Sequence, residues 1–156
     1  MEDSLKATAD NIAKVKAYLK KEEGIDYSDA VIRNWMEASH RGRIEKPQGY
    51  ADVGRSCGDG LEVFLRINQD RIIEARFFSD GCICTIAAGN MTVVLAEGRE
   101  VYDAFDIDAG TVMDALGGLP PGEEHCAELT CTALREALRD YLTYKNEPWK
   151  RTYPKP

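Results

Sequence analysis

The chain has 156 residues, of which 44% are hydrophobic and 30% are charged, a balance typical of one soluble globular domain. Its formal net charge of −7 argues against binding to nucleic acid or to an anionic membrane surface, because those partners attract basic proteins. No apolar run approaches the ~18 residues that a bilayer span requires, and the acidic start Met1-Glu2-Asp3 is unlike a signal peptide. We therefore expect a cytoplasmic protein.

Two helices are predicted at the start of the chain. Apolar residues recur at helical spacing from Ser4 to Glu23, and Gly24 is suited to end that helix. A second helix is predicted to begin at Ser28. The segment from Arg41 to Gly49 is basic and polar and is predicted to be a loop.

Three strands are predicted next. The first lies around Tyr50 to Arg55, and the second is the alternating run from Leu61 to Asn68. A turn at Asn68-Gln69-Asp70 leads into the third, from Arg71 to Ser79. In the third strand one face is expected to be apolar, formed by Ile73, Ala75 and Phe77.

Helices dominate the second half of the sequence. A mostly apolar helix is predicted from Ile83 to Glu97, and a short one from Asp108 to Leu116. The run from Gly117 to Gly122 contains two prolines and three glycines and is predicted to be a rigid loop before a final helix near His125 or Cys126. Strands followed by helices indicate an α+β fold, in which several helices cover one face of a small three-stranded antiparallel sheet.

The chain contains five cysteines, an odd number that cannot form a complete disulfide framework. Three of them occupy loop or helix-start positions that suit a thiolate: Cys57, Cys82 and Cys126. Asp59 and His125 lie beside two of these in the sequence. Although a single loop cysteine is usually incidental, three such placements favour a metal or cluster site built from separate segments.

The other two cysteines are predicted to pack in the interior. Cys131 lies five residues after Cys126, a rotation of about 500° on a helix, and shares the apolar stripe of the final helix. Cys84 lies inside the first turn of its helix, where it either packs or supplies a spare sulfur.

Several short motifs follow one another along the chain: Tyr27-Ser28, Cys57-Gly58-Asp59, Ala75-Arg76-Phe77, Gly81-Cys82, Ile86-Ala87-Ala88, Leu119-Pro120-Pro121, His125-Cys126 and Asp140-Tyr141. Between the three cysteines of this set lie 24 and 43 residues. Together they resemble the iron–sulfur cluster assembly scaffolds of the IscU type, which also form the N-terminal domain of NifU proteins. The resemblance implies a scaffold domain over 27–145, preceded by a helical extension (1–26) and followed by a tail (146–156).

This resemblance implies a protein that is not an enzyme but carries a [2Fe–2S] cluster and transfers it to apo-proteins. The ligands would be the thiolates of Cys57, Cys82 and Cys126, with Asp59 or His125 as the fourth. A cysteine desulfurase would donate sulfur as a persulfide, and by position Cys126 would accept it. The sequence leaves the oligomeric state open, and a homodimer is one of the possibilities.

One departure affects the expected partners. After Leu119-Pro120-Pro121 the family continues with Val-Lys, whereas this chain has Gly122-Glu123, so we do not expect strong binding of the specialised DnaK-like chaperone. Two other functions use the same thiolates. One is a zinc-dependent sulfur acceptor, since Zn²⁺ also binds cysteine with Asp or His. The other is a structural or regulatory metal-binding protein.

Overall fold

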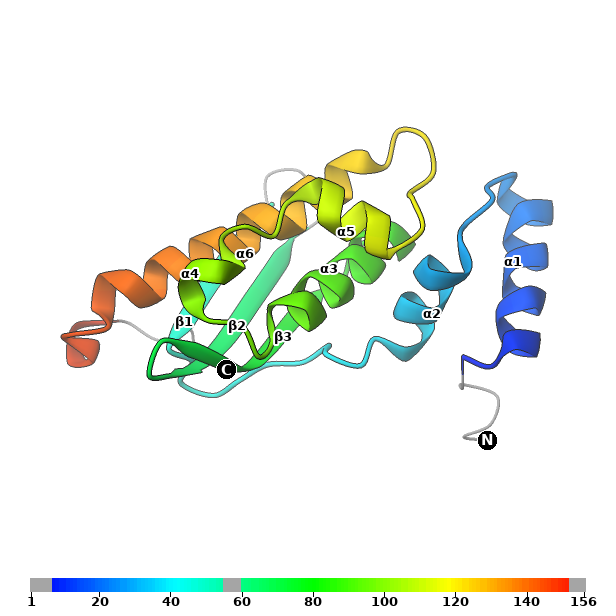
Figure 1. Cartoon of the computed structure of the whole chain (residues 1–156). Coiled ribbons are helices and arrows are strands. Elements are labelled where there is room, and N and C mark those ends of the chain that lie inside the picture. The colour runs from blue at the N-terminus through cyan, green and yellow to red at the C-terminus, as the bar shows by residue number, and fades with distance from the viewer. Residues whose placement is uncertain (1–6, 55–59, 152–156) are drawn as a thin grey trace.

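The structure is a computed structural model that describes residues 7–54 and 60–151. Its elements in chain order are α1 (Ala9–Glu23), α2 (Asp29–Glu37), β1 (Gly49–Val53), β2 (Leu61–Asn68), β3 (Arg71–Ser79), α3 (Ile83–Ala96), α4 (Val101–Ala104), α5 (Ala109–Ala115), α6 (Glu124–Tyr144) and the 3₁₀ helix η3 (Pro148–Lys150). The strands form one antiparallel sheet in the order β1-β2-β3. Figure 1 shows α3 and α6 on the same side of this sheet. The predicted α+β fold is confirmed.

The core lies between the sheet and these two helices. Side chains that alternate along β2 and β3 are buried beneath them, the largest being Leu61, Leu65 and Phe77. Helix α6 packs on β1 and β2, and α3 packs on β3. Because α3 is apolar on nearly all sides, it is also covered by α2, and α1 in turn packs against α2 at the edge of the molecule (Figure 1).

Capping residues decide where several elements begin and end. The first helix begins at Ala9 rather than Ser4, because the Thr8 hydroxyl accepts a hydrogen bond from the backbone N–H of Asn11. It ends at Gly24, as predicted, where φ is +73°. The final helix begins one residue before the predicted His125.

The prediction for one face of β3 is wrong at Ile73. The pairing of β2 with β3 shifts between Arg66 and Ile67, so that Arg66 pairs with Glu74 but Ile67 pairs with Ile72. Ile73 is the extra residue of this bulge and is 51% exposed, while Ile72 is fully buried. An irregularity of one residue moves the apolar face of the strand to the neighbouring position.

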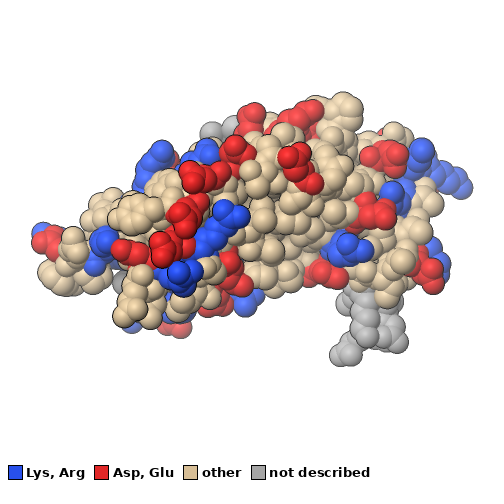
Figure 2. Space-filling view, in the orientation of Figure 1, with Lys and Arg blue, Asp and Glu red and all other residues tan. Residues whose placement is uncertain are grey.

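Acidic side chains gather over α4 and α6 on the face drawn in Figure 2. This agrees with the sequence, in which the segment from Glu97 to Asp140 has eleven acidic residues and three basic ones. In the part of the chain that the structure describes, no helix combines the length and apolar character needed to cross a membrane.

Candidate functional site

In the sequence the first cysteine motif precedes β2 and the second follows β3, and the start of β2 lies beside the end of β3. Leu61, the first residue of β2, pairs with Ser79, the last residue of β3. The buried Ser79 hydroxyl donates to the Gly60 carbonyl (2.9 Å) and accepts from the Gly81 amide (3.0 Å), so it links the residue before β2 to the residues after β3. The predicted ligands Cys57 and Asp59 lie outside the described residues.

Cys82 and Cys126 meet at this end of the molecule from two different helices. Cys82 is the N-cap residue of α3 and is exposed, whereas Cys126 lies in the first turn of α6 and is fully buried. The buried Thr85 hydroxyl lies between them, with its Oγ1 3.4 Å from the Cys82 Sγ and 3.5 Å from the Cys126 Sγ. A single hydroxyl therefore contacts both sulfur atoms.

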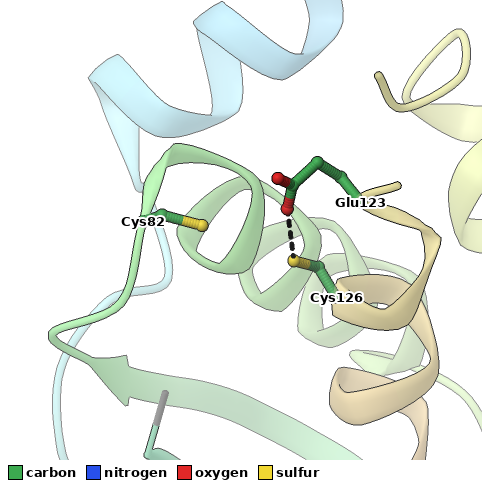
Figure 3. A group of neighbouring side chains, drawn as sticks. All are labelled: Cys82, Glu123 and Cys126. Atoms are coloured by element: carbon green, nitrogen blue, oxygen red, sulfur yellow. Dashed lines mark hydrogen bonds between the residues drawn. The ribbon is translucent and has the colours of Figure 1, made fainter. Parts of the chain in front are cut away.

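A third side chain, Glu123, completes a cluster that the sequence analysis did not single out. Its Oε2 lies 3.5 Å from the Cys126 Sγ. One carboxylate oxygen and the sulfurs of Cys82 and Cys126 all lie within 4.8 Å of one another, and the three side chains point toward a common space (Figure 3). A signal was present in the sequence, because residues three apart at a helix start share a face.

His125 lies on the exposed side of Cys126. Its Nδ1 is 3.1 Å from the Gly122 carbonyl oxygen, which can only accept a hydrogen bond, so Nδ1 carries the proton. In the neutral imidazole the lone pair is then on Nε2, which lies 3.7 Å from the Cys126 Sγ. A backbone carbonyl that fixes one ring nitrogen in this way is typical of metal-binding histidines.

Burial changes the expected chemistry of Cys126. The sequence position at a helix start favours a thiolate, but burial above all, together with the neighbouring Cys82 and Glu123, raises the pKa of the Cys126 thiol to about 12. The hydrogen bond from Thr85 acts in the opposite direction. The role of Cys126 as a ligand thiolate stays a prediction.

The remaining described cysteines are interior thiols. Cys131 is 1% exposed and packs in the core, as predicted. Cys84 is 2% exposed, and burial raises its pKa to about 12. All four described cysteines are free thiols.

The arrangement supplies both soft and hard ligands. The sulfurs of Cys82 and Cys126 are suited to iron, iron–sulfur clusters and zinc. The carboxylate of Glu123 and the imidazole of His125 add one oxygen and one nitrogen ligand beside them. Such a mixed set at a partly exposed position is chemically able to hold a metal group with one side open for exchange.

Comparison with known proteins identifies close relatives over most of the chain. The family model described as the NifU-like N terminal domain matches residues 26–148. The chain is 35% identical over 117 residues to the iron-sulfur cluster assembly scaffold protein IscU 1 of Archaeoglobus fulgidus, covering 74% of this chain and 76% of that protein. It is 40% identical over 124 residues to the bifunctional protein NifU/MnmA of Rubrobacter xylanophilus, covering 78% of this chain but 25% of that protein.

Solved structures show the same fold at lower sequence identity. A candidate iron–sulfur cluster assembly scaffold for the SUF system from Fervidobacterium islandicum AW-1 superposes with a TM-score of 0.59 at 19% identity, covering 72% of this chain and 96% of that one. The N-terminal part of a NifU-like protein from Brucella abortus gives a TM-score of 0.56 at 15% identity, covering 73% of this chain and 92% of that one.

Proposed function

Because the chain belongs to the NifU-like N terminal domain family, we propose that it is a scaffold on which a [2Fe–2S] cluster is assembled and from which it is transferred to apo-proteins. The observation that supports this most directly is that Cys82 and Cys126, which come from two different helices, meet at the Thr85 hydroxyl. Relatives of similar length are named as iron-sulfur cluster assembly scaffold proteins.

In this proposal three thiolates bind the cluster: Cys57, Cys82 and Cys126. Asp59 or His125 supplies the fourth ligand. A hard oxygen or nitrogen ligand binds iron less firmly than a fourth thiolate would. The cluster can then be released to a client protein, which is what a scaffold requires. The role is that of a carrier rather than of a catalyst.

Sulfur arrives as the persulfide of a cysteine desulfurase. The Cys126 thiol first loses its proton, and the His125 Nε2 at 3.7 Å is positioned to accept it. The Cys126 thiolate then forms a bond with the outer sulfur of the donor persulfide while the S–S bond of the donor breaks, and the donor leaves as a thiolate. Iron and electrons come from further proteins.

Cluster reconstitution in two cysteine variants tests this proposal. The protein is purified without oxygen, supplied with ferrous iron, a desulfurase, free cysteine as its substrate and a thiol reductant, and analysed by visible absorption and for iron, acid-labile sulfide and zinc. Wild type should bind iron and sulfide in equal amounts. Cys82→Ala should lose the cluster, whereas Cys131→Ala, which alters a packed core thiol, should retain it. Equal loss in both variants contradicts the ligand set. Zinc alone in the wild type favours the zinc-dependent sulfur acceptor.

A further inference from the structure

The link between β3 and α3 carries a buried hydroxyl that the scaffold function leaves without a role. This link is short: Ser79 ends β3, Asp80 and Gly81 follow, and Cys82 is the N-cap residue of α3. Cys82 makes no side-chain capping hydrogen bond. Its own side chain therefore does not fix the start of the helix, and the residues that lead into it become important.

Ser79 occupies a core-facing position of the sheet, where an apolar side chain is usual. It pairs with Leu61, and both side chains are buried. A buried hydroxyl requires hydrogen-bond partners, and that of Ser79 donates to the Gly60 carbonyl and accepts from the Gly81 amide. The Ser79 carbonyl also accepts a hydrogen bond from the Arg41 guanidinium (3.0 Å). Ser79 is therefore held through both its side chain and its backbone.

Gly81 fits tightly between the Ser79 hydroxyl and the side chain of Thr85. A Cβ atom added at Gly81 would lie 2.9 Å from the Thr85 Cβ, 3.0 Å from the Thr85 Cγ2 and 3.2 Å from the Ser79 Oγ. The space at this position therefore admits only glycine. On its other side, Thr85 contacts the sulfurs of Cys82 and Cys126 through its hydroxyl. A displacement of Gly81 would therefore reach the group that contacts both sulfurs.

We propose that Ser79 is a positioning residue for the two thiols. Its hydroxyl holds the Gly81 peptide against Thr85, and Thr85 holds the sulfurs of Cys82 and Cys126 at their spacing. Ser79 acts through these contacts and not as a ligand. The inference rests on the proposed function, because it takes the two thiols as the ligands that are positioned.

Loss of the hydroxyl should disturb the site more than the fold. Without it, the Gly81 amide and the Gly60 carbonyl must find other partners, and the link moves to reach them. A bound metal group requires its ligands within about 0.5 Å of the productive geometry. A small shift of the link therefore weakens binding and changes the coordination geometry.

Cobalt titration of the full-length metal-free protein tests the inference. Co²⁺ is added without sulfide or desulfurase. The thiolate-to-cobalt charge-transfer band measures the affinity, and the ligand-field bands report the geometry. Ser79→Ala removes the hydroxyl, whereas Ser79→Thr keeps a hydroxyl at the same position. We expect about 10-fold weaker Co²⁺ binding and altered ligand-field bands in Ser79→Ala, and values close to the wild type in Ser79→Thr.

Thr92→Val is the matched control. It removes a second buried hydroxyl, two turns further along α3 from Thr85. Its urea midpoint should fall as that of Ser79→Ala does, but its Co²⁺ affinity and spectrum should equal those of the wild type. Amide hydrogen exchange of the metal-free proteins adds a readout without metal: the Gly81 amide should exchange faster in Ser79→Ala and at the wild-type rate in Thr92→Val.

Three outcomes overturn the inference: Co²⁺ affinity and spectrum unchanged in Ser79→Ala, the same change in Thr92→Val, or a Ser79→Thr variant as impaired as Ser79→Ala. A fourth comes from Gly81→Ala, which keeps the Ser79 hydroxyl and crowds Thr85 instead. Unaltered ligand-field bands in that variant would show that displacement of Gly81 does not reach the sulfurs.

Cluster reconstitution with a desulfurase separates the inference from the scaffold function. If the wild type forms a cluster while Ser79→Ala binds Co²⁺ normally, the inference is wrong and the scaffold proposal stands. If the wild type forms no cluster but Ser79→Ala weakens Co²⁺ binding and alters its bands, the scaffold proposal is wrong and the inference stands.

Discussion

At the scale of single residues, Thr85 links the two helix starts of the site. Its hydroxyl contacts the sulfurs of both Cys82 and Cys126 and is fully buried. Thr85→Val keeps the shape of the side chain and removes these contacts. We expect a loss of about 0.5–1.5 kcal/mol in unfolding free energy and about 10–100-fold weaker Co²⁺ binding, because a hydroxyl that orients metal ligands is lost. Urea unfolding and cobalt titration measure the two effects.

A second buried threonine of α3 provides the matched control. The Thr92 hydroxyl bonds to Thr130 (2.8 Å) and to the Ala88 carbonyl (2.7 Å), two turns away from the thiols. Thr92→Val should therefore cost a similar stability and leave the Co²⁺ affinity unchanged. If both variants lose affinity equally, the effect of Thr85 is general loosening of α3 and not orientation of the sulfurs.

At the scale of elements, helix α6 lies very close to strand β1 at Gly49. A Cβ atom added at Gly49 would lie 2.6 Å from the Ala137 carbonyl oxygen of α6, and real Cβ atoms essentially never come that close. Since the obstacle is helix backbone, the two elements would have to move apart. Gly49→Ala should lower the unfolding free energy by about 1–3 kcal/mol, measured by urea unfolding.

A glycine in helix α5 gives the opposite expectation. Gly110 lies inside α5, and a Cβ there would meet only the Asp108 Oδ1 at an ordinary 3.5 Å. Gly110→Ala should raise the unfolding free energy by about 0.4–1 kcal/mol, because it restricts the unfolded chain. A neutral Gly49→Ala beside a stabilising Gly110→Ala would show that α6 can move away from β1 without loss.

The sequence predicted those features that depend on local signals. The helix caps at Ser28 and Asp108 and the stop at Gly24 are set by single residues, and each occurs as predicted. The exposure of Ile73 could not be predicted, because the bulge depends on the register with the neighbouring strand. Helix α4 has only four residues, too few for a periodic pattern to show.

The candidate site, like the fold, has some features that could be predicted from the sequence and others that could not. The positions of Cys82 and Cys126 at helix starts were predictable from the chain around each of them. Their distance from one another was not, because it depends on the packing of α3 against α6. The burial of Cys126 follows from the same packing, which is why its raised pKa has no signal in the sequence. The sequence does show that Glu123 lies three residues before Cys126. That spacing indicates a contact with the Cys126 sulfur only once the arrangement of the site is known.

At the scale of the whole molecule, α6 connects the site to the opposite end of the sheet. Its 21 residues span about 31 Å, from Glu124 beside the thiols to Tyr144 near the turn between β2 and β3. On that turn Asp70 accepts hydrogen bonds from the Tyr141 hydroxyl and from the Lys145 ammonium. This contact fastens the far end of the helix to the hairpin, so it supports the site only through the rigidity of α6.

The charges of this contact predict how its stabilising effect depends on pH. The hydrogen bond from Tyr141, and to a smaller extent that from Lys145, holds the pKa of Asp70 below its usual 3.8. The ionised Asp70 therefore stabilises the folded protein above that pH, and this stabilisation is lost as the pH falls further. The hydrogen bond to Asp70 raises the pKa of Lys145. Burial is the main cause that raises the pKa of Tyr141 to about 12, and the Asp70 carboxylate adds to this effect. Their contributions are present below about pH 10 and are lost as the pH rises toward 12.

Asp70→Asn should therefore destabilise the protein most between about pH 4 and 10 and progressively less outside that window. The measurement is the urea midpoint of wild type and variant from pH 2.5 to 11, read as the difference between the two at each pH, so that other titrating groups cancel. The exposed Asp106, changed to Asn, serves as the control and should show no such pH-dependent difference. A difference for Asp70→Asn that is the same at pH 7 and pH 2.5 would mean that the carboxylate acts there through shape and not through charge, and that the far end of α6 is fastened by the Tyr141 hydroxyl alone.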